Sequence, residues 1–315
     1  MRILKFGGKS LDTPEKTQKI CKYIKKIYEK DKEIIVVVSA IGSTTDKLLS
    51  FVKPLNAENI SKRELDVLLS TGETISASIF AMHLNNINVP AKSLQAWQVK
   101  INTMGDFQNS IITNIDKSSI EKCFQEEKVA VVTGFQGINK NGDISTLGRG
   151  GSDTTATALG ATFQTNVELY SDFNGVYACD PNEIKSKKFK RVSLKHLDIV
   201  TQTGSRVVCN RAVQIAKKHN ISLILKSSAE PKQKGTIANN IESNNISICT
   251  NQNLCMISII CDHFNKTKFI LQNVNLWLNS IKLYNLDSDL CKITILINQS
   301  DKEQVLSILK EKLKL

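Results

Sequence analysis

Residues Thr146-Leu-Gly-Arg-Gly-Gly-Ser-Asp-Thr-Thr-Ala-Thr-Ala-Leu-Gly160 join a glycine-rich loop directly to an Ala/Thr/Leu-rich helix. Glycines let a backbone approach a ligand closely, and a helix N-terminus presents free N–H groups and a positive dipole to an anion. Arg149 adds a planar guanidinium that matches a carboxylate or a phosphate. The loop is therefore predicted to bind a charged substrate. The alternative is an ordinary turn capped by Ser152 or Asp153.

On both sides of this loop, apolar strands alternate with amphipathic helices. Strands are predicted at Arg2–Phe6, Glu33–Ser39, Val129–Thr133, Val167–Tyr170 and Ile221–Leu225. Helices are predicted near residues 14–30, 61–84, 116–127, 151–162 and 207–218. The segment Glu33–Ser39 is almost wholly apolar, as expected of a parallel strand covered on both faces. The predicted fold class is α/β, a three-layer sandwich around a mostly parallel sheet.

A second, smaller unit is predicted after a boundary. Residues 235–253 are polar and rich in Asn and Ser, which indicates a linker or an irregular crossing. We expect one domain over residues 1–240 and another over 250–315. The second contains predicted strands at Met256–Ile260, Ile281–Asn285 and Lys292–Ile297, with helices around Val274 and Ile308. This βαββα order is ferredoxin-like, and so small a unit should pack on the first domain or on a partner.

The composition narrows the class of protein. The chain has 315 residues, eight cysteines without a C-x-x-C pair and four histidines, so no zinc pattern is present and a reducing compartment is indicated. No run is long and apolar enough to predict a membrane span or a leader, so a cytoplasmic protein is expected. The net charge of +12 comes from scattered lysines without interleaved aromatics, which argues against nucleic-acid binding. It suits anionic small substrates.

The segment Lys5-Phe-Gly-Gly-Lys-Ser10 also indicates phosphate chemistry. It is not a Walker A loop, because Ile3 stands where that motif needs glycine. Gly7 and Gly8 instead form a predicted two-glycine phosphate turn, with Lys5 reaching toward a transferred phosphoryl group. The alternative is a plain strand-to-helix turn. The later glycine loop likewise fails the dinucleotide pattern, because Asp153 occupies the place of its third glycine.

Four further segments are rich in Gly, Ser, Thr or acidic residues. Three of them follow predicted strands, and Ser70–Glu73 interrupts a predicted helix with a glycine. They are Ser39–Asp46, Ser70–Glu73, Gly134–Gly137 and Tyr170–Tyr177, the last followed by Asp180-Pro-Asn182. Each alone is better explained as a structural turn. Together they put polar loops at the ends of several strands, where open α/β sheets bind ligands.

These motifs, in this order, resemble the aspartate kinases. The resemblance is carried by KFGGKSL, SAIGSTTD, KRELDVLLSTGE, GFQGI, STLGRGGSDTTA and YSDFNGVYACDP, and it spans roughly residues 2–230. It implies the amino-acid-kinase fold and an ATP- and Mg²⁺-dependent enzyme. The C-terminal unit resembles an ACT domain, of which the family usually carries two and this chain has room for one.

The resemblance implies two groups of site residues. Aspartate would be bordered by Ser39, Thr45 and Phe135, its ammonium held by Glu73, its α-carboxylate by Arg149, with Ser152 and Asp153 organising the reacting groups. The nucleotide would be held by Lys5, Gly7, Gly8, Ser10, Ser171, Asp172, Tyr177, Arg206 and Val207. Lys5 and Asp153 are the expected catalytic pair, and no protein metal ligands are expected.

The implied reaction is phosphorylation of the β-carboxylate of L-aspartate to 4-phospho-L-aspartate, the first step toward lysine and diaminopimelate, threonine and methionine. The nucleophile is already ionised at neutral pH, so no general base is required. Catalysis then reduces to in-line positioning and stabilisation of charge on the phosphoryl group.

Several positions depart from the family pattern. Lys9 replaces threonine, Asn182 replaces arginine, Arg206 replaces lysine, and Val208-Cys209-Asn210 replaces Leu-His-Pro. These changes leave open a degenerate homologue that binds partners without catalysis, or a kinase of the same fold for another amino acid. With a single ACT-like unit, we expect a homodimer with weak or absent feedback inhibition.

Overall fold

The computed structural model describes residues 1–55, 60–203, 207–251, 256–281, 283 and 285–315. An eight-stranded sheet forms its centre, in the order β10-β12-β11-β9-β1-β2-β6-β3. The strands are β1 (Arg2–Phe6), β2 (Ile34–Val38), β3 (Ala91–Leu94), β6 (Val129–Thr133), β9 (Val167–Ser171), β10 (Arg191–Ser193), β11 (Leu223–Ser227) and β12 (Thr236–Asn239). From β11 to β3 the neighbours are parallel, and only β11 and β12 pair antiparallel.

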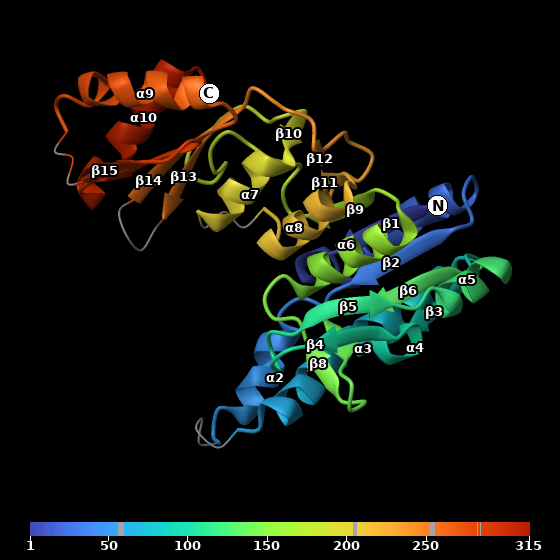
Figure 1. The fold of residues 1–315 in the computed structure, drawn as a ribbon. Helices are drawn as coiled ribbons and strands as arrows, with labels where there is room; N and C mark the ends of the chain where they lie inside the picture. Colours follow the sequence, from blue (N-terminus) through green and yellow to red (C-terminus); the bar gives the residue numbers. More distant parts are fainter. Residues whose placement is uncertain (56–59, 204–206, 252–255, 282, 284) are drawn as a thin grey trace.

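Helices cover both faces of this sheet and give three layers (Figure 1). Residues of β1 alternate between the faces, so that Ile3 and Leu4 enter different cores. One core includes residues of α5, α6 and α8, and the other includes residues of α1 and α3. The helices are α1 (Pro14–Tyr28), α2 (Thr44–Val52), α3 (Lys62–Asn86), α4 (Ala96–Val99), α5 (Ser118–Gln125), α6 (Gly151–Phe163), α7 (Leu194–Gln202) and α8 (Asn210–His219). The α/β three-layer prediction is confirmed.

A second sheet of four short strands lies beside the central one, in the order β5-β4-β7-β8. Its strands are β4 (Ile101–Met104), β5 (Ile111–Ile115), β7 (Gln136–Ile138) and β8 (Ile144–Thr146). The strand β8 leads straight into the glycine loop before α6, so this sheet fixes one end of that loop.

The C-terminal unit is an antiparallel sheet in the order β13-β14-β16-β15, covered by two helices (Figure 1). Its elements are β13 (Ile246–Asn251), β14 (Met256–Cys261), α9 (Phe264–Trp277), β15 (Asn285–Ser288), β16 (Lys292–Leu296), the 3₁₀ turn η3 (Gln299–Asp301) and α10 (Lys302–Leu313). The predicted βαββα order is present, preceded by one more strand.

The prediction of an irregular linker over residues 235–253 is wrong. That segment contains β12, which pairs with β11 and β10 in the central sheet, and β13, which pairs with β14 along its whole length. Both strands are short and carry polar residues between apolar ones, so pairing with distant strands, rather than local propensity, determines their conformation. The strand expected at Ile281–Asn285 includes residues 282 and 284, which lie outside the described residues; the described strand of this region is β15, Asn285–Ser288.

Side chains and backbone tie the C-terminal unit to the first part of the chain. The amide of Ile248 donates to the carbonyl of Ala178 at 2.7 Å, and the Lys302 Nζ lies 2.6 Å from Glu183 Oε1. His196 of α7 is buried, with its Nε2 2.8 Å from the Ser247 hydroxyl. The two units therefore share a continuous, partly buried junction.

One described helix, α3, is long and apolar enough to cross a membrane by length and composition alone. Half of that segment is buried inside the fold, where α3 contacts β3, β6 and β8. Its composition is that of a core helix.

Candidate active site

The predicted site loops meet at the carboxyl ends of neighbouring parallel strands. Gly7 follows β1, Ser39 follows β2 and Gly134 follows β6. The amide of Ser39 donates to the Phe6 carbonyl at 3.2 Å and that of Gly134 to the Val38 carbonyl at 3.0 Å, which extends the strand pairing into the loops. Open α/β sheets bind ligands at this edge.

Lys5 and Asp153 form an ion pair at the carboxyl ends of these strands. Lys5 Nζ lies 2.6 Å from Asp153 Oδ1, and the two side chains are only 12% and 16% exposed. The second carboxylate oxygen of Asp153 accepts the Cys209 amide at 3.3 Å. A nearly buried cation beside the Gly7 backbone is suited to stabilise charge on a phosphoryl group. The two residues expected to form a catalytic pair are thus in direct contact.

The turn after β1 leaves no room for a side chain at Gly8. A Cβ there would lie 2.3 Å from the Ala40 carbonyl oxygen, whereas one at Gly7 would lie no closer than 3.5 Å to the Lys5 Nζ and 3.8 Å to the Tyr170 carbonyl oxygen. Gly8 begins the 3₁₀ turn η1 (Gly8–Ser10), and its carbonyl accepts the Gly42 amide at 3.0 Å. The loops after β1 and β2 are therefore pressed together by their backbones.

Replacing Gly8 with alanine is expected to destabilise the protein by about 1–3 kcal/mol, because the backbone contact with Ala40 must open. Gly7→Ala is the matched control, since its new methyl group makes only ordinary van der Waals contacts, with the Lys5 Nζ and the Tyr170 carbonyl oxygen. Urea unfolding of the two variants measures the difference. Equal midpoints would show that the turn can relax without cost.

Glu73 brings a carboxylate from α3 to the same place. It is 4% exposed, and its Oε1 accepts the Ala40 amide at 2.9 Å. Its Oε2 is buried without a hydrogen-bond partner among the described residues. Burial raises the pKa of Glu73 to about 7. A buried acceptor left without a donor is costly, which indicates that a ligand or water supplies one.

Two hydroxyl groups near the same strand ends share this property. Ser10 Oγ and Thr133 Oγ1 are buried and have no hydrogen-bond partner in the described part of the chain. Ser10 ends η1, and Thr133 ends β6 immediately before Gly134. Unpartnered polar atoms on α3, η1 and β6 thus gather around one edge of the sheet.

Phe135 and Ser152 lie side by side where β6 meets α6. A Cβ at Gly134 would fall 2.7 Å from the Ser152 Cβ, and one at Gly151 would fall 2.8 Å from the Phe135 ring. Phe135 has a φ of 69°, and its amide donates to the Thr155 hydroxyl at 3.1 Å. The strained turn is therefore held by α6 and presents Phe135 at the site.

Arg149 is exposed at the tip of the glycine loop, between Gly148 and Gly150, whose φ values of 74° and 72° favour glycine. Arg149 belongs to a loop that is anchored by hydrogen bonds from distant side chains. The amide and hydroxyl of Thr146 donate to the buried Asp66 carboxylate at 2.7 and 2.8 Å, and Arg211 donates to the Leu147 carbonyl at 2.8 Å. Sequence analysis missed the anchoring roles of Asp66 and Arg211, because nothing local pairs positions so far apart.

The residues predicted to bind nucleotide are less tightly grouped. Ser171 ends β9 and is half-buried, and the exposed Asp172 lies 3.5 Å from the Lys9 Nζ. Tyr177 lies farther along, bridged to Lys188 in a short antiparallel contact. Val207 packs against the core, and Arg206 lies outside the described residues. Thr45, from the aspartate group, is half-buried in the first turn of α2.

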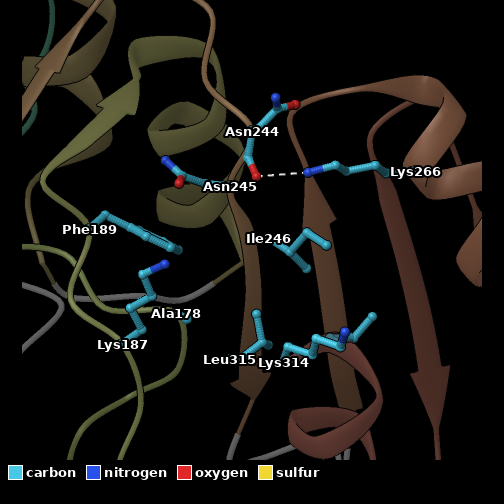
Figure 2. A pocket seen from close by; sticks show the side chains of 10 residues that line it. Ala178, Lys187, Phe189, Asn244, Asn245, Ile246, Lys266, Lys314 and Leu315 are labelled. Carbon is cyan, nitrogen blue, oxygen red and sulfur yellow. Dashed lines mark hydrogen bonds between the residues drawn. The ribbon is translucent and has the colours of Figure 1, made fainter.

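A pocket of about 170 Å³ lies elsewhere, at the junction with the C-terminal unit (Figure 2). It is lined by side chains of β13, of α9 and of the segment before β10, together with the last residues of the chain, and Lys266 donates to the Asn244 carbonyl at 2.8 Å. None of the residues that line it is a predicted site residue. The strand-end site and this pocket are thus separate places.

The residues of the strand-end site lie within a part of the chain that matches a known family. The family model described as the amino acid kinase family matches residues 1–227. The chain belongs to the amino acid kinase family.

Its relatives within that family are aspartokinases. The chain is 39% identical to the aspartokinase of Geobacillus stearothermophilus over 237 residues, which is 75% of this chain and 58% of that protein. It is 34% identical to the Rickettsia bellii aspartokinase over 285 residues, 87% of this chain and 70% of that one. The chain thus spans about three fifths of the first of these relatives.

Solved structures agree on the fold. The structure of E. coli aspartokinase III in complex with aspartate and ADP matches with a TM-score of 0.82 at 17% identity, covering 100% of both chains. Aspartate kinase from Clostridium acetobutylicum matches with a TM-score of 0.73 at 17% identity, covering 99% of both. At this level of identity the likeness describes the architecture of the chain, including its C-terminal unit.

Proposed function

We propose that the chain is an aspartate kinase that uses MgATP to convert L-aspartate to 4-phospho-L-aspartate. The observation that carries the proposal is Glu73, a buried carboxylate that binds the Ala40 amide in the loop after β2 and has one oxygen without a partner among the described residues. An amino acid substrate brings the ammonium group that such an oxygen lacks. The similarity to aspartokinases supports aspartate as that amino acid.

In the proposed reaction, an oxygen of the substrate's β-carboxylate attacks the γ-phosphorus of ATP. One O–P bond forms and the bond to the leaving ADP oxygen breaks, so no proton has to be removed from the nucleophile. Lys5 and the amides of the Gly7–Gly8 turn would hold the transferred phosphoryl group. Glu73 and Arg149 would hold the ammonium and α-carboxylate, which fixes the β-carboxylate in line.

Mg²⁺ fits the available groups in one way. The described residues contain no group of three or more His, Cys, Asp or Glu side chains that could hold a metal ion. Mg²⁺ commonly binds through substrate phosphates, and both Asp153 oxygens already meet protein groups, Lys5 and the Cys209 amide. The ATP phosphates would therefore hold the ion, and the expectation of no protein metal ligands stays a prediction. Bound there, it would neutralise phosphate charge during transfer.

The test is trapping of acyl phosphate by hydroxylamine, with ATP and Mg²⁺ and with aspartate, glutamate and N-acetylglutamate in parallel. Hydroxamate with aspartate alone is the expected result. Hydroxamate from another acceptor would identify a different amino-acid kinase. A folded protein that forms none, and whose melting temperature ignores ATP and aspartate, would support the degenerate alternative.

Arg149→Ala is expected to raise KM for aspartate about 10- to 100-fold with a smaller change in kcat, because a charge-assisted bond to the α-carboxylate is lost. Arg63→Ala is the control, since Arg63 is also exposed but pairs with Glu64 and Asp143. Steady-state kinetics over aspartate concentration measures the effect. An unchanged KM would remove Arg149 from the substrate site.

The homodimer expected from a single ACT-like unit and the domain limits 1–240 and 250–315 stay predictions. In the structure the first strand of the C-terminal sheet begins at Ile246, between the two limits. Weak or absent feedback inhibition belongs to the same proposal.

A further inference from the structure

Cys209 lies directly against the glycine loop that carries Arg149. It precedes α8 as the N-cap residue, and its thiol donates to the Arg149 carbonyl at 3.5 Å. Its amide donates to Asp153 Oδ2 at 3.3 Å. The Thr154 hydroxyl lies 3.9 Å from the Cys209 Sγ and 3.2 Å from the Gly150 carbonyl. One residue thus contacts the loop before α6 and the first turn of that helix.

The contact between Cys209 and this loop includes the backbone itself. A Cβ at Gly150 would fall 2.3 Å from the Cys209 Cβ and 2.6 Å from its Sγ. Because Gly150 has no side chain, the loop backbone rests on Cys209, and the position of Cys209 limits the path that the loop can take. The other side of the loop is fixed by Asp66 through Thr146.

The Asp153 carboxylate is therefore held by two groups that lie far apart in the sequence. Lys5 of β1 binds Oδ1 at 2.6 Å, and the Cys209 amide binds Oδ2. Because both oxygens are held, the plane of the Asp153 carboxylate is fixed. The direction from which Oδ1 attracts the Lys5 ammonium group is then fixed as well. Whatever moves Cys209 moves both the Lys5–Asp153 pair and the backbone of Arg149.

We propose that Cys209 is a positioning residue for phosphoryl transfer, whose thiol fixes the Arg149–Asp153 segment in the orientation that binds the acceptor. The proposal rests on the proposed function. Because the thiol bonds the loop and not the substrate, its loss should act mainly on acceptor binding through Arg149.

The first test compares Cys209→Ala with Cys209→Ser by steady-state kinetics. Removing the donor is expected to raise KM for aspartate about 3- to 10-fold, the range for one neutral hydrogen bond, with less effect on KM for ATP. Serine keeps a donor, so Cys209→Ser should recover most of the loss. Cys249→Ala is the matched control, a half-buried free cysteine of β13.

Two outcomes would overturn the proposal in this test. One is a Cys209→Ala protein with wild-type KM and kcat. The other is a uniform loss of activity that follows a lowered melting temperature, with KM unchanged and no recovery in the serine variant, which is the behaviour of a merely structural residue.

The second test measures alkylation of each thiol by iodoacetamide in the wild-type protein, read by mass spectrometry. MgADP with aspartate is expected to slow the reaction of Cys209 by at least about fivefold and to leave Cys249 unchanged, because thiol reactivity follows access. If the protein forms no hydroxamate but MgADP with aspartate still slows the alkylation of Cys209, the proposed kinase activity is wrong, whereas the position of Cys209 beside the ligand-binding loop is supported. Rates that ignore the ligands would overturn the proposal.

Discussion

Lys5→Met is expected to lower kcat by about 10³-fold while the protein remains folded. Lys5 is the one cation that the structure places in contact with Asp153 at the strand-end site within the described residues, and its Nζ lies beside the Gly7 backbone. Removing a preorganised donor aimed at developing charge costs about 10²- to 10³-fold in rate. Loss of a full positive charge in a nearly buried site puts the effect at the upper end.

The control for Lys5→Met must separate chemistry from stability, because the substitution also leaves a buried carboxylate without its cation. Lys226→Met serves this purpose. Lys226 is 12% exposed, as Lys5 is, and lies 3.2 Å from Glu168, which is 10% exposed, on the same sheet. Glu168 keeps its second cation, Arg2, so this control reports the loss of a nearly buried lysine and its ion pair at a distance from the strand-end site. Hydroxamate formation and thermal unfolding are measured for both. If Lys226→Met lost as much activity as Lys5→Met, the loss would reflect broken ion pairs and not phosphoryl transfer.

Glu73→Gln is expected to raise KM for aspartate about 100-fold, since a buried carboxylate facing an ammonium is replaced by a neutral amide. In the wild-type protein the same interaction predicts a pH dependence. With the pKa of Glu73 near 7 before binding, the carboxyl is protonated at lower pH, so KM for aspartate should rise as pH falls below about 7. A KM that is flat between pH 6 and 8 would contradict the assignment.

The same substitution should stabilise the ligand-free protein at pH 8. The raised pKa means that the folded state holds a proton on Glu73 more tightly than the unfolded state does. Its contribution to stability is complete below the unfolded pKa near 4.5 and is lost as pH rises through about 7. The loss is about 2–3 kcal/mol, and Glu73→Gln removes it.

Urea unfolding of wild type and Glu73→Gln at pH 5 and pH 8 measures this effect. Glu121→Gln, on the exposed face of α5, is the control. If the free energies of unfolding of wild type and Glu73→Gln changed by the same amount between pH 5 and pH 8, Glu73 would not titrate in that range. Together the two measurements test whether the site is built for substrate at the expense of stability.

The central strands were predictable because short runs rich in Ile, Val and Leu are bounded by glycine or polar loops. The strands β1, β2, β6 and β9 lie within one residue of the predicted limits, and β2 and β6 are apolar except for one threonine. The second sheet was not predicted. Its strands β7 and β8 have three residues each and carry polar side chains, so only their pairing partners define them.

The sequence singles out candidate site residues, but it does not show how they are arranged in space. The segment LLSTGE singled out Glu73, yet its unpartnered oxygen and raised pKa depend on the Ala40 loop and on the burial of α3. Likewise, Val208-Cys209-Asn210 was noticed only as a departure from a pattern. Its contact with Asp153 joins positions on two different helices, which no local sequence signal encodes.

The position of β1 in the sheet has a consequence for how the chain acquires its structure during synthesis. This strand precedes both of its neighbours in the sequence: β2 follows soon after it, but β9, whose Val167 pairs with Ile3, comes much later. The Gly7 amide then meets the Tyr170 carbonyl. The pairing of β1 is therefore completed late in synthesis, and long-range parallel pairing of this kind is slow. Until β9 is available, one edge of β1 stays open to wrong partners, and the Gly7–Gly8 turn that follows β1 lacks its contact with Tyr170.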